Sequence, residues 1–247
     1  MNDNFRDHKI AMTTEELFDD VYDREDLVYG LKPSPELASY LEQVQPTGFA
    51  VDLGAGPGRN SITLARSGLN VLAVDMSERG IERLAELAKK KVLADRIETR
   101  VGDVREFAFP DRGVSVMVAT TVLDHIPSID ACQLWKRIEA ALCDDGVVYA
   151  EVHTKEDPGC GESPGRDNPF PISETASGVK HYFGAGELLR LATKSGELRV
   201  LVYEERQEWD YTHGDEHHHG KAILLAVRNN FYPPWYGHPA AFPKRDA

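Results

Sequence analysis

Three glycines and one aspartate within residues 49–77 have the types and spacing of a nucleoside-binding site. Gly54, Gly56 and Gly58 follow a short apolar run, and Asp75 ends the next one. Glycine tolerates positive φ, and its missing side chain lets a ligand lie against bare backbone. A carboxylate that closes the following strand can accept hydrogen bonds from a ribose diol. The stretch therefore predicts a strand–turn–helix–strand unit that binds a nucleoside.

The glycine spacing and the charge beside it bear on which nucleoside binds. The dinucleotide fingerprint G-x-G-x-x-G leaves room for a pyrophosphate, whereas this turn reads G-x-G-x-G and is preceded by Asp52. A carboxylate there would repel a pyrophosphate and suit a cationic ligand such as S-adenosylmethionine, which carries a sulfonium and an α-amino group. Asp103, after the third expected strand, lies where an adenine amino group would be held. We favour the sulfonium nucleoside, with an NAD-linked enzyme as the alternative.

Apolar runs alternate with helical patterns through much of the chain, which is typical of a parallel sheet covered by helices. The runs begin at Phe49 and reach His153, and the one at 114–119 has the continuous apolar character of a buried parallel strand. Two further runs, 198–205 and 222–227, are joined by a polar, histidine-rich connection that predicts a hairpin. We therefore expect an α/β fold with a doubly wound, mostly parallel seven-stranded sheet and a C-terminal antiparallel hairpin.

Composition predicts one domain with flanking segments. Residues 1–45 are expected to form a helical cap segment, in which residues 13–16 (TTEE) offer a helix cap. Residues 46–228 would form the domain itself, and residues 229–247 a proline- and aromatic-rich tail. Residues 154–182 are rich in Pro, Gly and Ser without periodicity. Since a loop this long inside a domain is usually functional or disordered, we expect it to act as a substrate lid.

Charge and cysteine content limit the partners. The net charge of −13 argues against a nucleic-acid partner, because phosphate backbones need a basic surface. No apolar run approaches the ~18 residues of a membrane span, and the polar N-terminus lacks a signal-peptide pattern. The three cysteines have no metal-ligand spacing, and an odd number cannot all pair within one chain. We expect a cytoplasmic protein with a small-molecule substrate and neither nucleic-acid nor membrane partner, and we leave a homodimer open.

Four motifs occur in an order that resembles a known enzyme class. VDLGAGPGRN, AVDMS, GDV and VATTVLDHIP resemble the successive cofactor motifs of class I S-adenosylmethionine-dependent methyltransferases, which have a Rossmann-like fold. The resemblance extends from about Phe49 to Val227. More narrowly, GPGRNSITLA, YGLKPSPEL and GELLRLA resemble the tellurite-resistance branch, which methylates soft oxyanions or chalcogen compounds.

The resemblance implies a cofactor site drawn from several segments. Asp75 would bind the ribose hydroxyls, while Asp103 and Val104 would hold the adenine edge. Tyr29, together with Tyr22, would close over the cofactor, although simple packing explains both equally well. With Asp52, which the charge pattern indicates, the expected cofactor residues are Tyr29, Asp52, Gly54, Ala55, Gly56, Arg59, Asn60, Asp75, Met76, Asp103, Val104 and Thr120.

His125 is the candidate catalytic base, because imidazole titrates near neutrality and this residue follows the fourth strand. The alternative is that D-H-I-P is framework common to the class. A nucleophile that is already anionic needs no base, and in-line positioning can then supply much of the rate.

Cys160, His213 and His217 are candidates for contact with the methyl acceptor. A thiol in the long loop suits a soft chalcogen, although an ordinary loop cysteine is the simpler interpretation. On an extended hairpin, His217 and His219 share a face that His218 does not. We favour acceptor contact over a metal site for these histidines and expect no metal.

Taken together, the sequence predicts methyl transfer to a small molecule, with a chalcogen oxyanion or thiol of the tellurite or selenite type as the leading acceptor. The alternatives are a methyltransferase for an O- or N-acceptor and an S-adenosylmethionine-binding sensor without catalysis.

Overall fold

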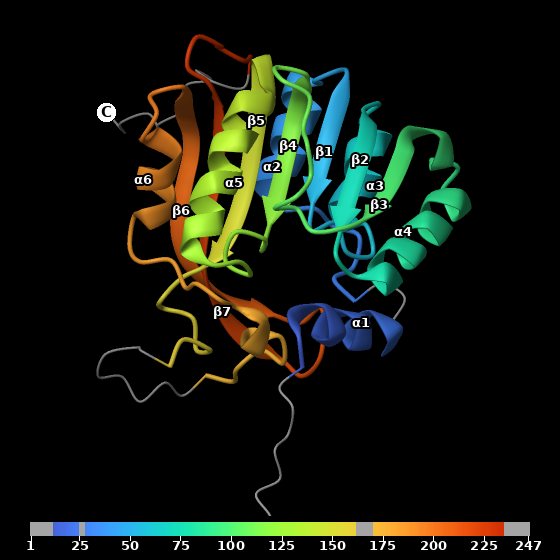
Figure 1. Ribbon diagram of the computed structural model, residues 1–247, viewed down its shortest axis with the longest axis vertical. Coiled ribbons are helices and arrows are strands. Elements are labelled where there is room, and N and C mark those ends of the chain that lie inside the picture. Colours follow the sequence, from blue (N-terminus) through green and yellow to red (C-terminus); the bar gives the residue numbers. More distant parts are fainter. Residues whose placement is uncertain (1–11, 25–27, 162–169, 235–247) are drawn as a thin grey trace, which may run out of the picture.

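In the computed structural model, which describes residues 12–24, 28–161 and 170–234, seven strands form one sheet in the order β3-β2-β1-β4-β5-β7-β6 (Figure 1). The pairs among β1 to β5 are parallel, while β7 is antiparallel to both β5 and β6. The elements are α1 (Thr14–Arg24), α2 (Pro35–Val44), β1 (Phe49–Leu53), α3 (Arg59–Arg66), β2 (Asn70–Asp75), α4 (Glu78–Lys90), η1 (Ala94–Arg96), β3 (Ile97–Val101), β4 (Val114–Thr120), α5 (Ser128–Ala141), β5 (Leu142–His153), η2 (Ala176–Gly178), α6 (Glu187–Thr193), β6 (Leu198–Asp210) and β7 (His217–Arg228). The expected doubly wound sheet with an antiparallel C-terminal hairpin is confirmed.

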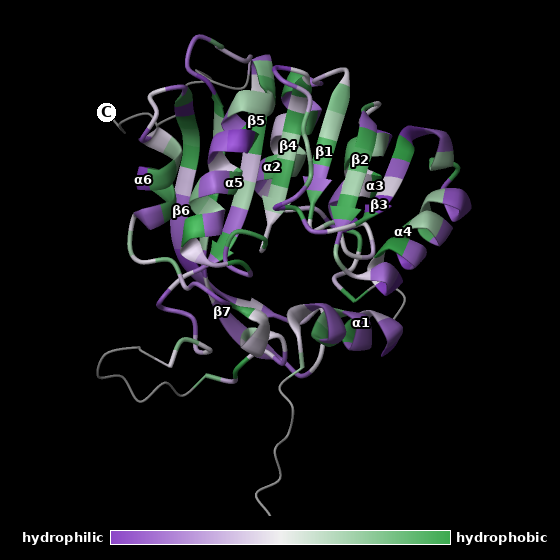
Figure 2. Cartoon of the chain, in the orientation of Figure 1, coloured by the Kyte–Doolittle hydropathy of each residue, from purple (hydrophilic) through white to green (hydrophobic). Residues whose placement is uncertain are grey.

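Two hydrophobic layers hold helices against the faces of this sheet (Figures 1 and 2). One face packs against α5 and α6, with Trp135 fully buried among strand residues. The other face packs against α2, α3 and α4, with Tyr40 of α2 fully buried. Within the described ranges, no helix is long and apolar enough to cross a membrane.

The glycine turn between β1 and α3 has the backbone conformation that the sequence predicts. Gly54, Gly56 and Gly58 have φ values of 64°, 48° and 103°, which L side chains rarely adopt. A Cβ at Gly54 would collide with Val122, and one at Gly58 would collide with Leu84 of α4. The turn therefore needs glycine both for its backbone and for the close approach of its neighbours.

Helix α1 lies across the ends of the parallel strands toward which their arrowheads point (Figure 1). It begins with a capping box, in which Glu16 N–H donates to Thr13 Oγ1 at 3.1 Å and Thr13 N–H donates to Glu16 Oε2 at 2.8 Å. Ser77 links α1 to α4, because its hydroxyl donates to Asp19 at 2.5 Å and accepts from Gly80 N–H at 2.9 Å. These bonds hold α1 over the strand ends.

The hairpin is longer than the sequence predicts. Strand β6 continues to Asp210 and β7 begins at His217, so the connection is shortened to residues 211–216. The expectation of a long polar connection was wrong because His217, His218 and His219 lie in the strand, paired with residues 208–210, and are buried. The polarity of residues 217–219 indicated a loop, but their pairing with β6 and their burial make them part of a strand.

Candidate active site

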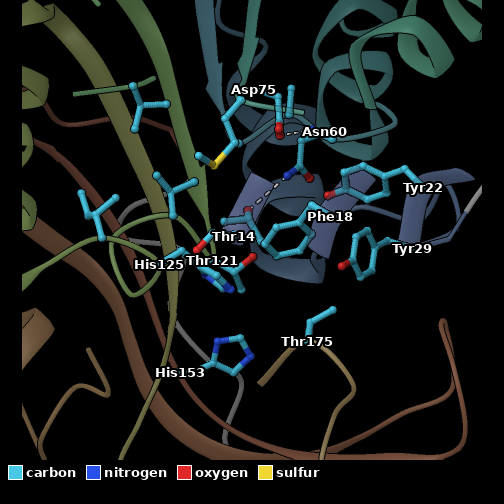
Figure 3. A pocket seen from close by; sticks show the side chains of 18 of the residues that line it. Thr14, Phe18, Tyr22, Tyr29, Asn60, Asp75, Thr121, His125, His153 and Thr175 are labelled. Atoms are coloured by element: carbon cyan, nitrogen blue, oxygen red, sulfur yellow. Dashed lines mark hydrogen bonds between the residues drawn. The ribbon is translucent and has the colours of Figure 1, made fainter. Parts of the chain in front are cut away.

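A cavity of about 450 Å³ lies at the carboxyl edge of the parallel strands (Figure 3). This edge is where open α/β sheets bind ligands, and the volume is that of a small-molecule site. Figure 3 shows Asp75 and Asn60 at one side of the cavity and His125 and His153 at another. The cavity therefore joins the glycine turn to a histidine-rich region.

Most of the residues expected from the sequence line this cavity. Of the expected cofactor residues, all but Asp52 do so: Tyr29, Gly54, Ala55, Gly56, Arg59, Asn60, Asp75, Met76, Asp103, Val104 and Thr120. His125 and His213 also line it, whereas Cys160 and His217 are not among its lining residues. Cys160 is buried, and its N–H donates to the Asp157 carbonyl.

Asp75 is held in place by the turn that it faces. Its Oδ2 accepts the Gly56 N–H at 2.7 Å, and its Oδ1 accepts the Ser77 N–H at 2.8 Å. Burial raises the pKa of Asp75, and the two N–H donors act against that rise. Each carboxylate oxygen keeps a lone pair for a further donor, so Asp75 suits a diol.

Asp52 lies behind the cavity wall. It is 1% exposed, and its Oδ2 accepts from the Ser61 hydroxyl at 2.6 Å, while Oδ1 has no hydrogen-bond partner among the described residues. Burial raises the pKa of Asp52 to about 7. The structure therefore offers this carboxyl no direct contact with a ligand in the cavity, and its influence there is electrostatic.

Asn60 and Thr120 form a polar pair between the glycine turn and β4. Asn60 Nδ2 donates to Thr120 Oγ1 at 3.1 Å. Asn60 Oδ1 is buried without a partner in the described part of the chain. A buried, unpaired amide oxygen is costly unless a ligand donates to it, so this atom marks a position for an N–H or O–H of the bound molecule.

Asp103 shares its carboxylate with a neighbouring arginine. Arg105 Nε donates to Asp103 Oδ1 at 3.0 Å and to Oδ2 at 2.9 Å, and the hydrogen bonds from Arg105 lower the pKa of Asp103. Arg105 also reaches Asp130 at 3.0 Å. The carboxylate is thus ionised and oriented at the edge of the cavity.

Aromatic side chains from the N-terminal segment cover the glycine turn (Figure 3). Phe18 stacks on Tyr22, and Tyr22 meets Tyr29 edge-on with ring centroids 6.1 Å apart. The Tyr22 hydroxyl would lie only 2.8 Å from a Cβ at Gly56. Burial raises the pKa of both tyrosines, which therefore stay neutral.

A buried carboxylate, Asp124, orients two histidines of the cavity. Its Oδ1 lies 3.3 Å from His125 Nδ1, and its Oδ2 lies 2.5 Å from His153 Nδ1. Burial alone would raise the pKa of Asp124, but the two histidines outweigh it and hold that pKa well below its usual range. His125 Nε2 is buried without a partner among the described residues. The arrangement has the geometry of an oriented general base.

Sequence reasoning missed His153 and Lys221, which both line the cavity. The Lys221 ammonium lies 2.8 Å from Glu208 and 3.9 Å from Glu151. Burial opposes its charge, but these two carboxylates hold the pKa of Lys221 above its ordinary value. A signal was present for Lys221, since a charged side chain within an apolar strand needs a partner or a ligand.

Comparison with known proteins bears on this site. Residues 50–146 match the family model of a methyltransferase domain. The match covers β1 to the start of β5, which includes the glycine turn, Asp75 and Asp103. The part of the site that lies within this match therefore resembles a methyltransferase domain.

One curated relative aligns with only part of the chain. A 27-O-demethylrifamycin SV methyltransferase of Amycolatopsis mediterranei is 31% identical over 78 residues, which are 31% of this chain and 29% of that protein. The aligned segment thus spans less than a third of the curated relative.

Solved structures have folds similar to that of this chain. An S-adenosylmethionine-dependent methyltransferase from Methanosarcina mazei matches with a TM-score of 0.60 at 19% identity, covering 80% of this chain and 99% of that one. TehB from Haemophilus influenzae matches with a TM-score of 0.59 at 20% identity, covering 78% and 60%. At these identities the structures establish the fold.

Proposed function

We propose that this protein transfers a methyl group from S-adenosylmethionine to a small-molecule acceptor held beside His125 and His153. The observation that supports this most strongly is the continuity of the cavity, which is lined by the glycine turn and Asp75 as well as by both histidines. A donor and an acceptor held together in one enclosed space react as an effectively unimolecular pair.

The cofactor end of the cavity suits S-adenosylmethionine. When bound, this cofactor supplies an activated methyl group on a sulfonium. Asp75 would accept from its ribose hydroxyls, and Asn60 Oδ1, which is buried without a partner among the described residues, would accept from its α-amino group. Arg59, which lines the cavity at the start of α3, would face its carboxylate. The glycine turn removes the Cβ atoms that would block this approach.

His125 would remove the proton of an acceptor that carries one. Because Asp124 is an ionised acceptor, His125 Nδ1 carries the hydrogen, which leaves the lone pair of Nε2 directed away from Asp124. The acceptor proton passes to Nε2, and the carboxylate of Asp124 stabilises the imidazolium that results. His153, bound to the other oxygen of Asp124, stays in reach as an alternative base.

The leading acceptor class is a soft nucleophile, either a thiol or a chalcogen oxyanion of the tellurite or selenite type. It rests on the sequence resemblance to the tellurite-resistance branch. TehB and the Methanosarcina protein match about equally well, so the comparisons do not favour one branch. Cys160 does not line the cavity and contributes nothing to this preference.

We further propose that α1 and the segment around Thr175 and Lys180 form the lid. Thr14, Phe18 and Tyr22 of α1 line the cavity together with both of these residues. The backbone N–H of Lys180 donates to the Asp124 carbonyl at 2.8 Å, so the segment is tied to the residue that precedes the proposed base His125. Part of the expected lid loop, residues 162–169, lies outside the described residues, as do residues 235–247 of the tail.

A methyltransferase assay across thiols, selenite, tellurite and phenols tests the proposal, with production of S-adenosylhomocysteine as the readout. We expect turnover with at least one of these acceptors. Binding of S-adenosylmethionine without turnover on any of them would instead support a sensor. The variant His125→Ala then distinguishes two kinds of acceptor. An acceptor that is already anionic needs no base and keeps its methylation rate, whereas an acceptor that carries a proton loses rate.

A further inference from the structure

Four side chains of the β6–β7 hairpin direct one ligand atom each toward a common point. They are Asp210, His213, His217 and His219, and their ligand atoms all lie within 4.8 Å of one another. His217 and His219 share a face of β7 because side chains alternate along a strand. We propose that these four residues bind a divalent transition-metal ion of the zinc class. The sequence favoured acceptor contact for His213 and His217, and this convergence reverses that preference.

The hydrogen bonds of two of these histidines leave a position for a cation. His217 Nδ1 lies 2.7 Å from the Asp215 carbonyl, and His219 Nδ1 lies 3.0 Å from Asp157 Oδ2. Both partners are acceptors, so each Nδ1 carries the hydrogen. The two Nε2 lone pairs then face each other at 3.0 Å. Two facing lone pairs repel unless a cation lies between them.

These Nδ1 contacts are the kind that orient metal-binding histidines. A ligating imidazole usually donates its second N–H to a carboxylate or a backbone carbonyl, which fixes the ring and raises its basicity. His219 has the carboxylate of Asp157, and His217 has the Asp215 carbonyl. Asp157 is itself fixed, because it accepts the N–H groups of Gly159 and Gly220.

The distances fit a small tetrahedral ion after a modest contraction. With bonds of about 2.0–2.1 Å, the ligand atoms of tetrahedral zinc lie roughly 3.3 Å apart. The Asp210 Oδ2 atom lies 3.8 Å from His219 Nε2 and 3.9 Å from His213 Nε2. The His213 ring is buried, and its Nδ1 has no hydrogen-bond partner among the described residues. The side chains therefore need to move by less than 1 Å or so.

The donor set selects the class of metal. Imidazoles suit zinc, cobalt, nickel, copper and iron, while magnesium and calcium prefer oxygen ligands. The nearby ammonium of Lys221 does not oppose the ion strongly, because Glu208 and Glu151 compensate its charge. Three imidazoles and one carboxylate thus favour a borderline ion over a hard one.

The site borders the cavity that holds the proposed acceptor. Asp210, His213 and His219 line that cavity, whereas His217 lies behind them. If the proposed function holds, an ion here would attract an anionic or thiolate acceptor and would take it as a fifth ligand. Metal binding itself depends on neither donor nor acceptor and is tested without them.

The test is a zinc titration of the full-length, chelator-treated protein in competition with a chromophoric chelator. We expect one Zn²⁺ per chain with micromolar affinity or tighter, a visible spectrum of bound Co²⁺, and a rise in unfolding temperature with Zn²⁺ that Mg²⁺ does not produce. Asp157→Asn should weaken Zn²⁺ binding by about 10–100-fold, and His217→Gln by at least as much.

His218→Gln is the matched control. His218 is a buried histidine of the same strand that stacks on Phe170 on the opposite face, with ring centroids 4.3 Å apart, and we expect its loss to change the zinc affinity less than about twofold. If His217→Gln does not fold, Asp210→Asn at the end of β6 replaces it as the variant with a lost ligand. Equal zinc affinity in the wild type, His217→Gln and Asp210→Asn would overturn the proposal, as would magnesium binding as tight as zinc binding.

Discussion

The two ends of the cavity are built in different ways. The cofactor end consists of backbone turns and short-range contacts, in which Asp75 accepts the N–H groups of Gly56 and Ser77. The histidine end consists of side chains from distant segments, in which Asp124 joins His125 to His153 and Asp157 holds His219. Local motifs therefore predict the first end, while only the folded chain brings the second together.

The charges at the two ends differ as well. At the cofactor end, the carboxylates of Asp75 and Asp103 suit the ribose diol and the adenine amino group of the proposed cofactor. The histidine end has an ammonium, Lys221, and imidazoles whose protonation depends on their partners. Burial lowers the pKa of His219 to about 4, so this ring is neutral at neutral pH. The carboxylates of the cofactor end thus favour a cationic ligand, and the imidazoles of the histidine end favour a nucleophilic acceptor.

The largest effect we expect is the loss of the proposed base. His125→Ala should lower kcat for a thiol or phenol acceptor by about 10²–10⁴-fold, because the acceptor keeps its proton. The measurement is S-adenosylhomocysteine production at saturating donor. His181→Ala is the control, since His181 pairs with Glu187 and does not line the cavity. Activity of His125→Ala within a few-fold of wild type would retire the general-base role.

Loss of the Asp75 carboxylate should weaken binding of the proposed cofactor. Asp75→Asn should weaken S-adenosylhomocysteine binding by about 10-fold or more, the scale of a lost charged hydrogen bond. Calorimetric titration measures the dissociation constant. Glu98→Gln on exposed β3 is a matched control that should keep wild-type affinity. An unchanged affinity of Asp75→Asn would contradict the placement of the ribose.

Asp52 gives the cofactor end a pH dependence. Its folded pKa of about 7 lies above the unfolded value, so the folded chain binds an extra proton between about pH 4 and 7. The free energy of unfolding contributed by this group falls as pH rises through that window. The free energy of unfolding of Asp52→Asn, taken relative to that of the wild type, should therefore rise by about 2 kcal/mol from pH 5 to pH 7.

Urea unfolding at several pH values measures this difference. Ser61→Ala is the companion variant, because it removes the 2.6 Å bond to Asp52 and leaves the carboxyl in place. A stability difference between wild type and Asp52→Asn that does not change with pH would show that Asp52 keeps an ordinary pKa.

The smallest effect concerns Cys160, a candidate acceptor contact that is not among the residues lining the cavity. Cys160→Ser should change kcat/KM for every acceptor by less than about twofold, because the thiol is buried away from the cavity lining. The assay is the same acceptor panel. A selective loss for selenite or tellurite would instead place Cys160 at the acceptor.

These differences explain how much the sequence predicts. The mostly parallel sheet with its antiparallel hairpin and the glycine turn follow from periodicity and from motifs a few residues long, and both are confirmed. Asp52 carries the right charge beside the turn, but alternation along β1 directs its side chain toward Ser61 of α3. The histidines of β7 resemble a loop in sequence, because burial by partners as distant as Asp157 is invisible locally. In the sequence, His153 looks like the ordinary end of a strand, and only the folded chain brings Asp124 beside it.

The most direct test of the account is calorimetric titration of the wild-type protein with S-adenosylhomocysteine and, separately, with NADH. The glycine turn, Asp75 and the Asn60 oxygen, which has no partner among the described residues, predict one S-adenosylhomocysteine per chain and no detectable NADH binding. Tight NADH binding without affinity for S-adenosylhomocysteine would contradict the assignment of the cofactor end.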